Sequence, residues 1–292
     1  MISMLAGPTF AATDRPAVPV DARHLALQGV ALMAVFLLPA MILQGVDPRT
    51  FNDINVWVKP TKFALSLILY FATLAWAVGL LAPDPTAPGR RGRDGVRRGF
   101  LLALGAGLFE MAYISLQAAR GRASHFNQAT PVESLLYMVM GVGAVLLVAV
   151  SFDLGRRVLK TPQLGLGTGV RLGAGIGLTL GSAATLVTAG ILGSGAVPLA
   201  LGYPEGHWVG GSLSDALGLP FLGWSTTGGD LRVPHFFATH IMQVLPVLGW
   251  LADRISPRRA RPLVLAAAAV LVGVVVATFL QAVSGMPFLR IS

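Results

Sequence analysis

Seven segments of about twenty residues or more carry few or no charges, and this feature limits the fold more than any other. A helix rises about 1.5 Å per residue, so about twenty apolar residues cross the roughly 30 Å hydrocarbon core of a bilayer. The composition agrees, because 54% hydrophobic and 12% charged residues are too apolar a mixture for a soluble chain of 292 residues. The sequence therefore predicts an all-α polytopic membrane protein, a seven-transmembrane-helix bundle, with helices at about 25–46, 54–82, 99–119, 131–154, 168–194, 233–253 and 262–285.

Basic residues alternate between the two sides of this arrangement, which predicts its orientation. Fifteen of the 22 basic residues fall in the N-terminal tail and in every second connection, and seven fall on the other side. Cytoplasmic connections of membrane proteins are enriched in Lys and Arg. We therefore expect the N-terminus in the cytoplasm and the C-terminus outside. Residues 1–24 then form a cytoplasmic tail, 25–292 the transmembrane domain, and about 196–232 a long structured outer loop between the fifth and sixth helices.

The use of individual residue types narrows the classes of function. Without cysteine, these residues form no disulfide, thiolate metal site or iron–sulfur cluster. The net charge of +9 lies in the connections, so we expect membrane lipids and a lipophilic small molecule as partners, and no nucleic acid. Arginine supplies 19 of the 22 basic residues, a usage typical of GC-rich bacterial genomes, and we expect a bacterial inner membrane.

The fifth predicted helix contains glycines at a strict spacing of four, at Gly165, Gly169, Gly173, Gly177 and Gly181. This spacing places them on nearly one helix face, where small residues let another backbone approach closely. A glycine-rich phosphate cradle is the alternative, but no strand precedes these glycines. The pattern therefore favours helix packing.

Polar residues inside the apolar segments mark a candidate site. Glu110 lies about ten residues before the outer end of its helix, and Tyr113 and Gln117 follow on the same face. A charge in hydrocarbon costs about 2.5–3.5 kcal/mol on insertion scales, so we expect this face to contact protein. Arg120 and Arg122 continue the polar set into the next connection.

Histidines on the same outer side are candidate metal or b-type haem ligands. His235 and His240 begin the sixth helix, but five residues separate them by about 140°, so they cannot grip one metal ion as an i, i+4 pair. Ligands from other segments are needed, and His125 and His207 are the other outer-side histidines. We thus expect catalytic roles for Glu110, His240, Tyr113, Gln117 and Lys62, cofactor binding by Arg120, Arg122, Asp230 and Arg232, and metal ligation by His125, His207, His235 and His240.

The position of Lys62 depends on where the second helix starts. If it starts near Asn55, Lys62 lies about 10 Å into the membrane, at a depth where it could meet Glu110 or His240. If it starts at Pro60, Lys62 is interfacial and extends its ammonium group toward water. The sequence leaves both alternatives open.

Three classes of function fit this pattern. The first is a membrane-embedded enzyme or redox protein whose outward-facing polar pocket holds a metal ion or b-type haem and acts on a lipophilic substrate. The second is a proton-linked transporter or channel that uses Glu110. The third is a sensor or an accessory subunit of a membrane complex. Against all three stands a structural alternative, in which Glu110, His240 and Lys62 satisfy one another and lock the helices together.

Overall fold

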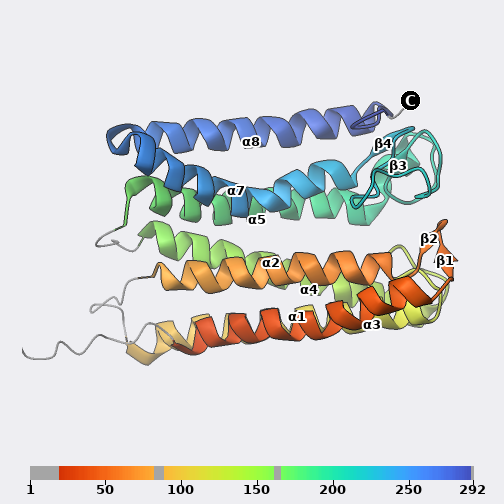
Figure 1. Ribbon diagram of the computed structural model, residues 1–292, viewed down its shortest axis with the longest axis horizontal. Coiled ribbons are helices and arrows are strands. Elements are labelled where there is room, and N and C mark those ends of the chain that lie inside the picture. The colour runs from red at the N-terminus through yellow and green to blue at the C-terminus, as the bar shows by residue number, and fades with distance from the viewer. Residues whose placement is uncertain (1–19, 82–88, 161–165, 291–292) are drawn as a thin grey trace, which may run out of the picture.

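The computed structural model describes residues 20–81, 89–160 and 166–290 of the chain (Figure 1). Seven of the helices in these ranges are long and apolar enough to cross a membrane, which confirms the predicted seven-helix bundle. The long helices are α1 (Val20–Val46), α2 (Val58–Gly79), α3 (Gly89–Ala119), α4 (Pro131–Lys160), α5 (Thr168–Ser194), α7 (Arg232–Ile255) and α8 (Ala260–Val283). The short elements are β1 (Thr50–Phe51), β2 (Ile54–Asn55), α6 (Ala196–Ala200), β3 (Trp208–Val209), β4 (Gly229–Asp230) and a 3-10 helix at Pro257–Arg259.

The long helices run side by side along the longest axis of the molecule (Figure 1). In that view α5, α7 and α8 lie above α1, α2, α3 and α4. The strands and the C-terminus lie at one end, which we call the loop end; it comprises residues 47–57, 120–130, 195–231 and 284–290. The other end holds the connection Ser256–Arg259 and is called the arginine end.

The start of the second helix differs from the sequence prediction. Residues 50–55 form a β-hairpin, in which β1 and β2 pair antiparallel, and α2 begins only at Val58. Asn52 and Asp53 at the hairpin tip have φ of 51° and 65°. Two residues with positive φ give the two-residue turn whose twist matches that of paired strands. The prediction of a helix from residue 54 was therefore wrong by four residues.

Two helices are longer than predicted at the arginine end. α3 begins at Gly89 instead of residue 99, and α4 ends at Lys160 instead of residue 154. The added turns contain several arginines. Hydrophobicity marks where a helix leaves the hydrocarbon, whereas the helix itself continues into the polar region. The hydrophobicity of the sequence therefore does not locate these two helix ends.

The glycines of α5 pack against α7, as predicted for the four that lie in the described residues; Gly165 lies outside them. A Cβ atom added at Gly173 would lie 2.6 Å from the carbonyl oxygen of Leu245, and one at Gly169 would collide with the carbonyl oxygen of Gly249. Gly177 and Gly181 likewise face backbone atoms of α7. The two backbones therefore approach too closely to admit side chains at these positions.

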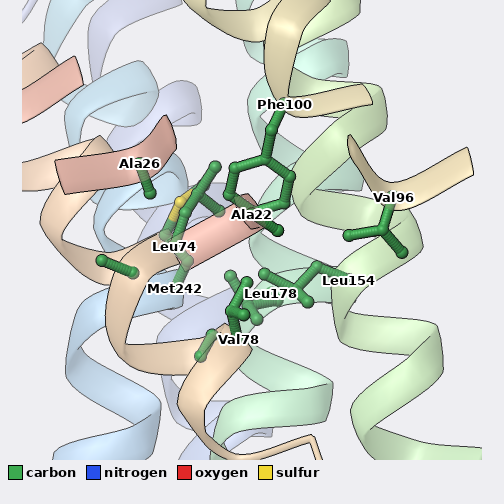
Figure 2. Close-up of a cluster of buried hydrophobic side chains, with 11 residues drawn as sticks. Ala22, Ala26, Leu74, Val78, Val96, Phe100, Leu154, Leu178 and Met242 are labelled. Carbon is green, nitrogen blue, oxygen red and sulfur yellow. The ribbon is translucent and has the colours of Figure 1, made fainter. Parts of the chain in front are cut away.

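An apolar cluster fills the half of the bundle next to the arginine end (Figure 2). It joins helices from both layers, because Leu74 of α2, Leu154 of α4, Leu178 of α5 and Met242 of α7 are all buried in it. Its members are Ala22, Ala26, Leu74, Ala75, Ala77, Val78, Val96, Phe100, Leu154, Leu178 and Met242.

We predict that Gly249→Ala destabilises the protein by about 1–3 kcal/mol, the usual cost of forcing a methyl group into a packed site. The added Cβ would collide with the carbonyl oxygen of Gly169, a backbone atom that cannot rotate away. Gly273→Ala in α8 is the matched control, because a Cβ there meets nothing within 4 Å. Thermal unfolding in detergent measures both, and equal melting temperatures for the two variants would contradict the prediction.

Candidate functional site

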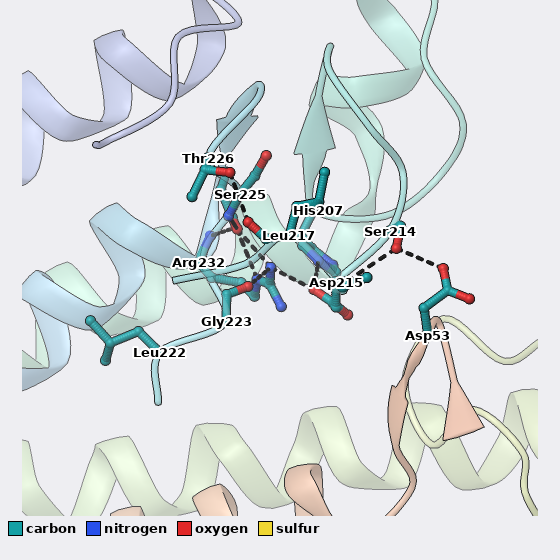
Figure 3. Close-up of polar contacts among 12 residues, drawn as sticks. Asp53, His207, Ser214, Asp215, Leu217, Leu222, Gly223, Ser225, Thr226 and Arg232 are labelled. Atoms are coloured by element: carbon teal, nitrogen blue, oxygen red, sulfur yellow. Dashed lines mark hydrogen bonds and ion pairs between the residues drawn. The ribbon is translucent and has the colours of Figure 1, made fainter. Parts of the chain in front are cut away.

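Arg232, the first residue of α7, is the centre of a buried ionic cluster in the long loop (Figure 3). Its guanidinium group donates to both carboxylate oxygens of Asp230, with Nη2 2.7 Å from Oδ2 and Nε 2.9 Å from Oδ1. Nη2 also lies 2.9 Å from Oδ1 of Asp215 and donates to the carbonyl oxygen of Gly223 at 2.7 Å. Asp230 is 1% exposed, so its carboxylate is buried beside the guanidinium group. Through these contacts Arg232 holds together the loop segments at Asp215, Gly223 and Asp230.

The electrostatics of this cluster favour charged carboxylates beside a neutral imidazole. Burial alone would raise the pKa of Asp215, but its interaction with His207 and the charge of Arg232 outweigh burial and lower that pKa. The same balance between burial and Arg232 lowers the pKa of Asp230. Burial, reinforced by the charge of Arg232, lowers the pKa of His207, whose Nε2 lies 3.8 Å from Asp215 Oδ1.

The long loop is attached to the other helix layer through the hairpin and α2. Ser214 donates to Asp53 Oδ2 at 2.6 Å, and the backbone nitrogen of Asp215 donates to the carbonyl oxygen of Asn52. Lys62 Nζ donates to the carbonyl oxygen of Leu222 at 3.0 Å. Because α2 starts at Val58, between the two predicted starts, Lys62 lies in its second turn, where it bonds to the loop.

Lys59, one turn before Lys62, lies between this cluster and Glu110. Its ammonium group is near enough to Glu110 and Asp215 for electrostatic attraction and to Arg232 for repulsion, but within the described residues it forms no ion pair shorter than 4 Å with any of them. Glu110 is 6% exposed. We call Lys59, Glu110, His125, Asp215 and Arg232 the polar interior. They come from five separate segments and lie beneath or within the loop end.

His125 borders the polar interior between aromatic rings. Its ring centroid lies 5.3 Å from that of Phe63 and 5.9 Å from that of Tyr137, and Ser124 Oγ is 3.2 Å from Nδ1. Burial, with the added charge of Lys59, lowers the pKa of His125 well below its ordinary value. The imidazole is therefore neutral at physiological pH.

Gln117 and Tyr113 belong to a neighbouring cluster around Glu133, a residue that the sequence reasoning missed. Gln117 Nε2 donates to Tyr113 Oη and to Glu133 Oε1, both at 3.3 Å, and Arg122 Nη2 donates to Glu133 Oε2 at 2.9 Å. Arg120 donates to Gln117 Oε1 at 3.0 Å. The four residues predicted to bind a cofactor are thus divided, with Arg120 and Arg122 at Glu133 and with Asp230 and Arg232 in the loop.

A recognisable sequence signal precedes Glu133. Thr130 and Glu133 form a capping box around Pro131, because the Glu133 nitrogen donates to Thr130 Oγ1 at 3.2 Å and Thr130 Oγ1 donates to Glu133 Oε2 at 3.1 Å. Thr-x-x-Glu with proline at the first helical position is a typical helix start. The Thr130 hydroxyl caps α4, and the Glu133 carboxylate, which accepts from Thr130 and Arg122, anchors the preceding connection.

A polar seam follows the contact of α5 with α7 toward the middle of the bundle. Thr188 Oγ1 is 3.1 Å from His235 Nδ1, and Thr185 donates to Thr239 at 3.4 Å. Deeper on α7, Gln243 donates to Thr73 of α2 at 3.2 Å. Within the described residues, the buried Ser182 Oγ and Gln243 Oε1 have no hydrogen-bond partner.

The four histidines predicted as metal ligands occupy four different surroundings. His125 packs between Phe63 and Tyr137, His207 against Trp208 with ring centroids 3.9 Å apart, His235 bonds to Thr188, and His240 packs on Phe236 at 4.2 Å. Across residues 20–81, 89–160 and 166–290, no three His, Cys, Asp or Glu side chains form a group that could hold a metal ion. The shared metal site expected from the sequence has no support in this arrangement.

The fold and these clusters define a class of protein: a multi-pass helical membrane protein with seven spans, whose charged interior is concentrated at one end. Comparisons with models of protein families, with curated proteins and with solved structures find no match to the chain.

We predict that acidification destabilises the protein through His125 and His207. Both pKa values are lowered in the folded state, so the unfolded chain binds more protons once the pH falls below the ordinary value of 6.5. The stability that the neutral imidazoles confer is complete above that pH and is lost progressively below it. Asp215 and Asp230, whose pKa values are also lowered, extend the loss below their ordinary value of 3.8.

Melting temperatures in detergent between about pH 7 and pH 5 test this prediction. We expect a decline for the wild-type protein and a flatter profile for the double variant His125→Gln/His207→Gln. Circular dichroism at neutral pH verifies that the variant keeps its helices. Parallel profiles for the two proteins would mean that these imidazoles do not control the pH dependence.

Proposed function

We propose that this protein is a membrane-embedded enzyme that acts on a lipophilic molecule with a polar head, and that its loop end faces away from the cytosol of a bacterial inner membrane. The observation that carries the proposal is the burial of Glu110, which is 6% exposed, within a membrane-spanning helix that also has the ammonium group of Lys59 in its surroundings. A carboxylate and an ammonium group are expensive to bury in hydrocarbon, and such residues mark functional sites in membrane proteins.

The groups of the polar interior suit acid–base chemistry. Glu110 is the candidate for transferring a proton to or from the substrate head, and Lys59 stabilises the carboxylate form or a developing negative charge. His125 adds a neutral imidazole at the border. Arg232 is engaged by two carboxylates and the Gly223 carbonyl group, so it positions the loop above these groups.

The distribution of polar groups supports a site with access from one side. Positive charges of Lys59, Lys62 and Arg232 accompany negative charges of Glu110, Asp215 and Asp230, all toward the loop end. The apolar cluster fills the bundle toward the arginine end. An amphipathic substrate would therefore place its head at the loop end and its tail in the adjacent leaflet.

The proposal names no metal ion, because no three His, Cys, Asp or Glu side chains in the part of the chain that the structure describes form a group that could hold one. Two residues of the purely structural alternative have other partners, since Lys62 donates to the carbonyl oxygen of Leu222 and His240 packs on Phe236.

Proton-linked transport is the second candidate, and the polar seam between α5 and α7 favours it. Hydroxyl, imidazole and amide groups extend from His235 to Gln243 and on to Thr73, which brings polar atoms to the middle of the bundle. A transporter needs a second state in which the apolar cluster opens toward the arginine end.

The enzyme proposal is tested by incubating protein in nanodiscs of total bacterial lipid extract and comparing the lipids by mass spectrometry. We expect the wild-type protein to convert one lipid species and Glu110→Gln to reduce the rate about 100-fold or more, as for loss of an acid–base group. Glu205→Gln is the matched control, because Glu205 is an exposed carboxylate of the same loop end. Equal conversion by wild type and Glu110→Gln would refute a catalytic role for Glu110.

The same preparations in vesicles that contain a pH-sensitive dye separate the two candidates. The enzyme proposal predicts no Glu110-dependent proton flux. A flux that Glu110→Gln abolishes, without any lipid conversion, would replace the proposal by transport.

We predict that the loop end faces away from the cytosol. Labelling of single introduced cysteines tests this orientation, because the sequence contains no cysteine of its own. Ala216 lies exposed in the long loop, and Arg258 lies exposed at the arginine end. In intact cells a membrane-impermeant maleimide should label Ala216→Cys and leave Arg258→Cys unlabelled, with the reverse in inside-out vesicles. The inverse result would place the loop end in the cytoplasm.

A further inference from the structure

A groove lies between α3 and α4 in the half of the molecule next to the arginine end. Its volume is about 190 Å³, and apolar side chains form most of its lining. Val96, Phe100 and Leu154 are its buried members and form the floor; the same residues belong to the apolar cluster (Figure 2). Leu102, which is 54% exposed, lies at the rim.

Two glycines of α3 keep the groove open. A Cβ atom at Gly95 would meet nothing within 4 Å, and one at Gly99 would meet only Val150 Cγ2 at 3.5 Å. Neither glycine is required by close contact of backbones, unlike those of α5. Their lack of side chains instead leaves space on the surface that faces lipid.

The length of the groove matches one leaflet of a bilayer. On α4 its lining extends from Leu146 to Arg157, which is roughly 16 Å at 1.5 Å per residue. Half of a hydrocarbon core of about 30 Å is nearly the same length. The volume is smaller than the roughly 300–1,000 Å³ of pockets that enclose a whole ligand, so it suits part of one acyl chain.

Basic residues lie on the ends of α3 and α4 where a lipid headgroup would lie, and one of them lines the groove. Arg157 lines it and pairs with Asp153 at 2.6 Å, while Arg156 lies 3.8 Å from the same carboxylate and is 52% exposed. A guanidinium group has five donors, so this pairing leaves donors for phosphate. Among the described side chains at this end of α3 and α4, basic residues outnumber acidic ones by five to two. The basic residues are Arg97, Arg98, Arg156, Arg157 and Lys160, and the acidic ones are Asp94 and Asp153.

We infer that this groove binds an anionic glycerophospholipid, with one acyl chain along α3 and α4 and its phosphate at Arg156 and Arg157. The apolar floor selects the chain, and the excess of positive charge selects an anionic headgroup over a zwitterionic one. The site is separate from the polar interior, so the inference does not depend on the proposed enzyme activity.

Native mass spectrometry of protein released from nanodiscs of phosphatidylglycerol or of phosphatidylcholine tests the inference. We expect the wild-type protein to retain one phosphatidylglycerol molecule after the other lipids are stripped, and to retain phosphatidylcholine on the order of 10-fold less. Arg156→Gln/Arg157→Gln should reduce retention of phosphatidylglycerol on the order of 10-fold. Arg258→Gln/Arg259→Gln is the matched control, because both of these arginines are exposed at the same end but outside the groove.

Filling the groove gives a second, independent test. Gly99→Leu should abolish retention of the lipid, whereas Gly141→Leu, on an exposed face of α4 with nothing within 4 Å, should not change it. The double variants Arg156→Gln/Arg157→Gln and Arg258→Gln/Arg259→Gln change only exposed or half-exposed side chains, so we expect both to fold. They therefore test the inference even if Gly99→Leu fails to fold. Equal retention of both lipids, or unchanged retention in the Arg156/Arg157 variant, would overturn the inference.

Discussion

The close contact between the backbones of α5 and α7 determines the position of the remaining functional elements. Glycines at Gly169, Gly173, Gly177 and Gly181 let α7 approach. Asp253 near the end of α7 accepts hydrogen bonds from the backbone nitrogens of Gly169 and Val170, in the first turn of α5, at 2.7 and 2.8 Å. A carboxylate at a helix N-terminus satisfies donors that have no partner within the helix. With α7 fixed along its length, its first residue, Arg232, is held at the loop end.

Around Arg232 the protein solves the problem of placing charges near hydrocarbon by pairing them across segments. The guanidinium group binds two carboxylates, and the lysines of α2 bring positive charge toward Glu110 and the loop. Hydrogen bonds from Ser214 to Asp53 and from Lys62 to the carbonyl oxygen of Leu222 connect this loop to the other helix layer, where the hairpin meets the long loop. Removing one partner would leave another charge buried alone, which costs more than the pair contributes.

The sequence predicted the spans well because the bilayer imposes a length and a polarity on every crossing helix. It predicted the packing role of the α5 glycines because their spacing is a property of one helix. It failed for the hairpin before Val58, whose Asn-Asp turn is too short to interrupt a hydrophobic profile. It could not predict the surroundings of His125, His207, His235 and His240, since these depend on contacts between segments that periodicity does not encode. Glu133 has a local signal in the Thr-x-x-Glu pattern, but it lies in the first turn of α4 and not deep in an apolar run, so the cost of charges in hydrocarbon does not single it out.

The apolar cluster connects the two ends of the molecule physically. On its inner side Leu74, Leu178 and Met242 close the bundle below the polar interior, and on its outer side Val96, Phe100 and Leu154 form the floor of the groove between α3 and α4. Packed side chains respond to a change in volume as a group, because protein interiors contain little free space. An acyl chain in the groove would therefore add contacts to the same residues that separate the polar interior from the arginine end. A lipid in the groove and the contacts of Leu74, Leu178 and Met242 that close the bundle would then stabilise the same apolar cluster.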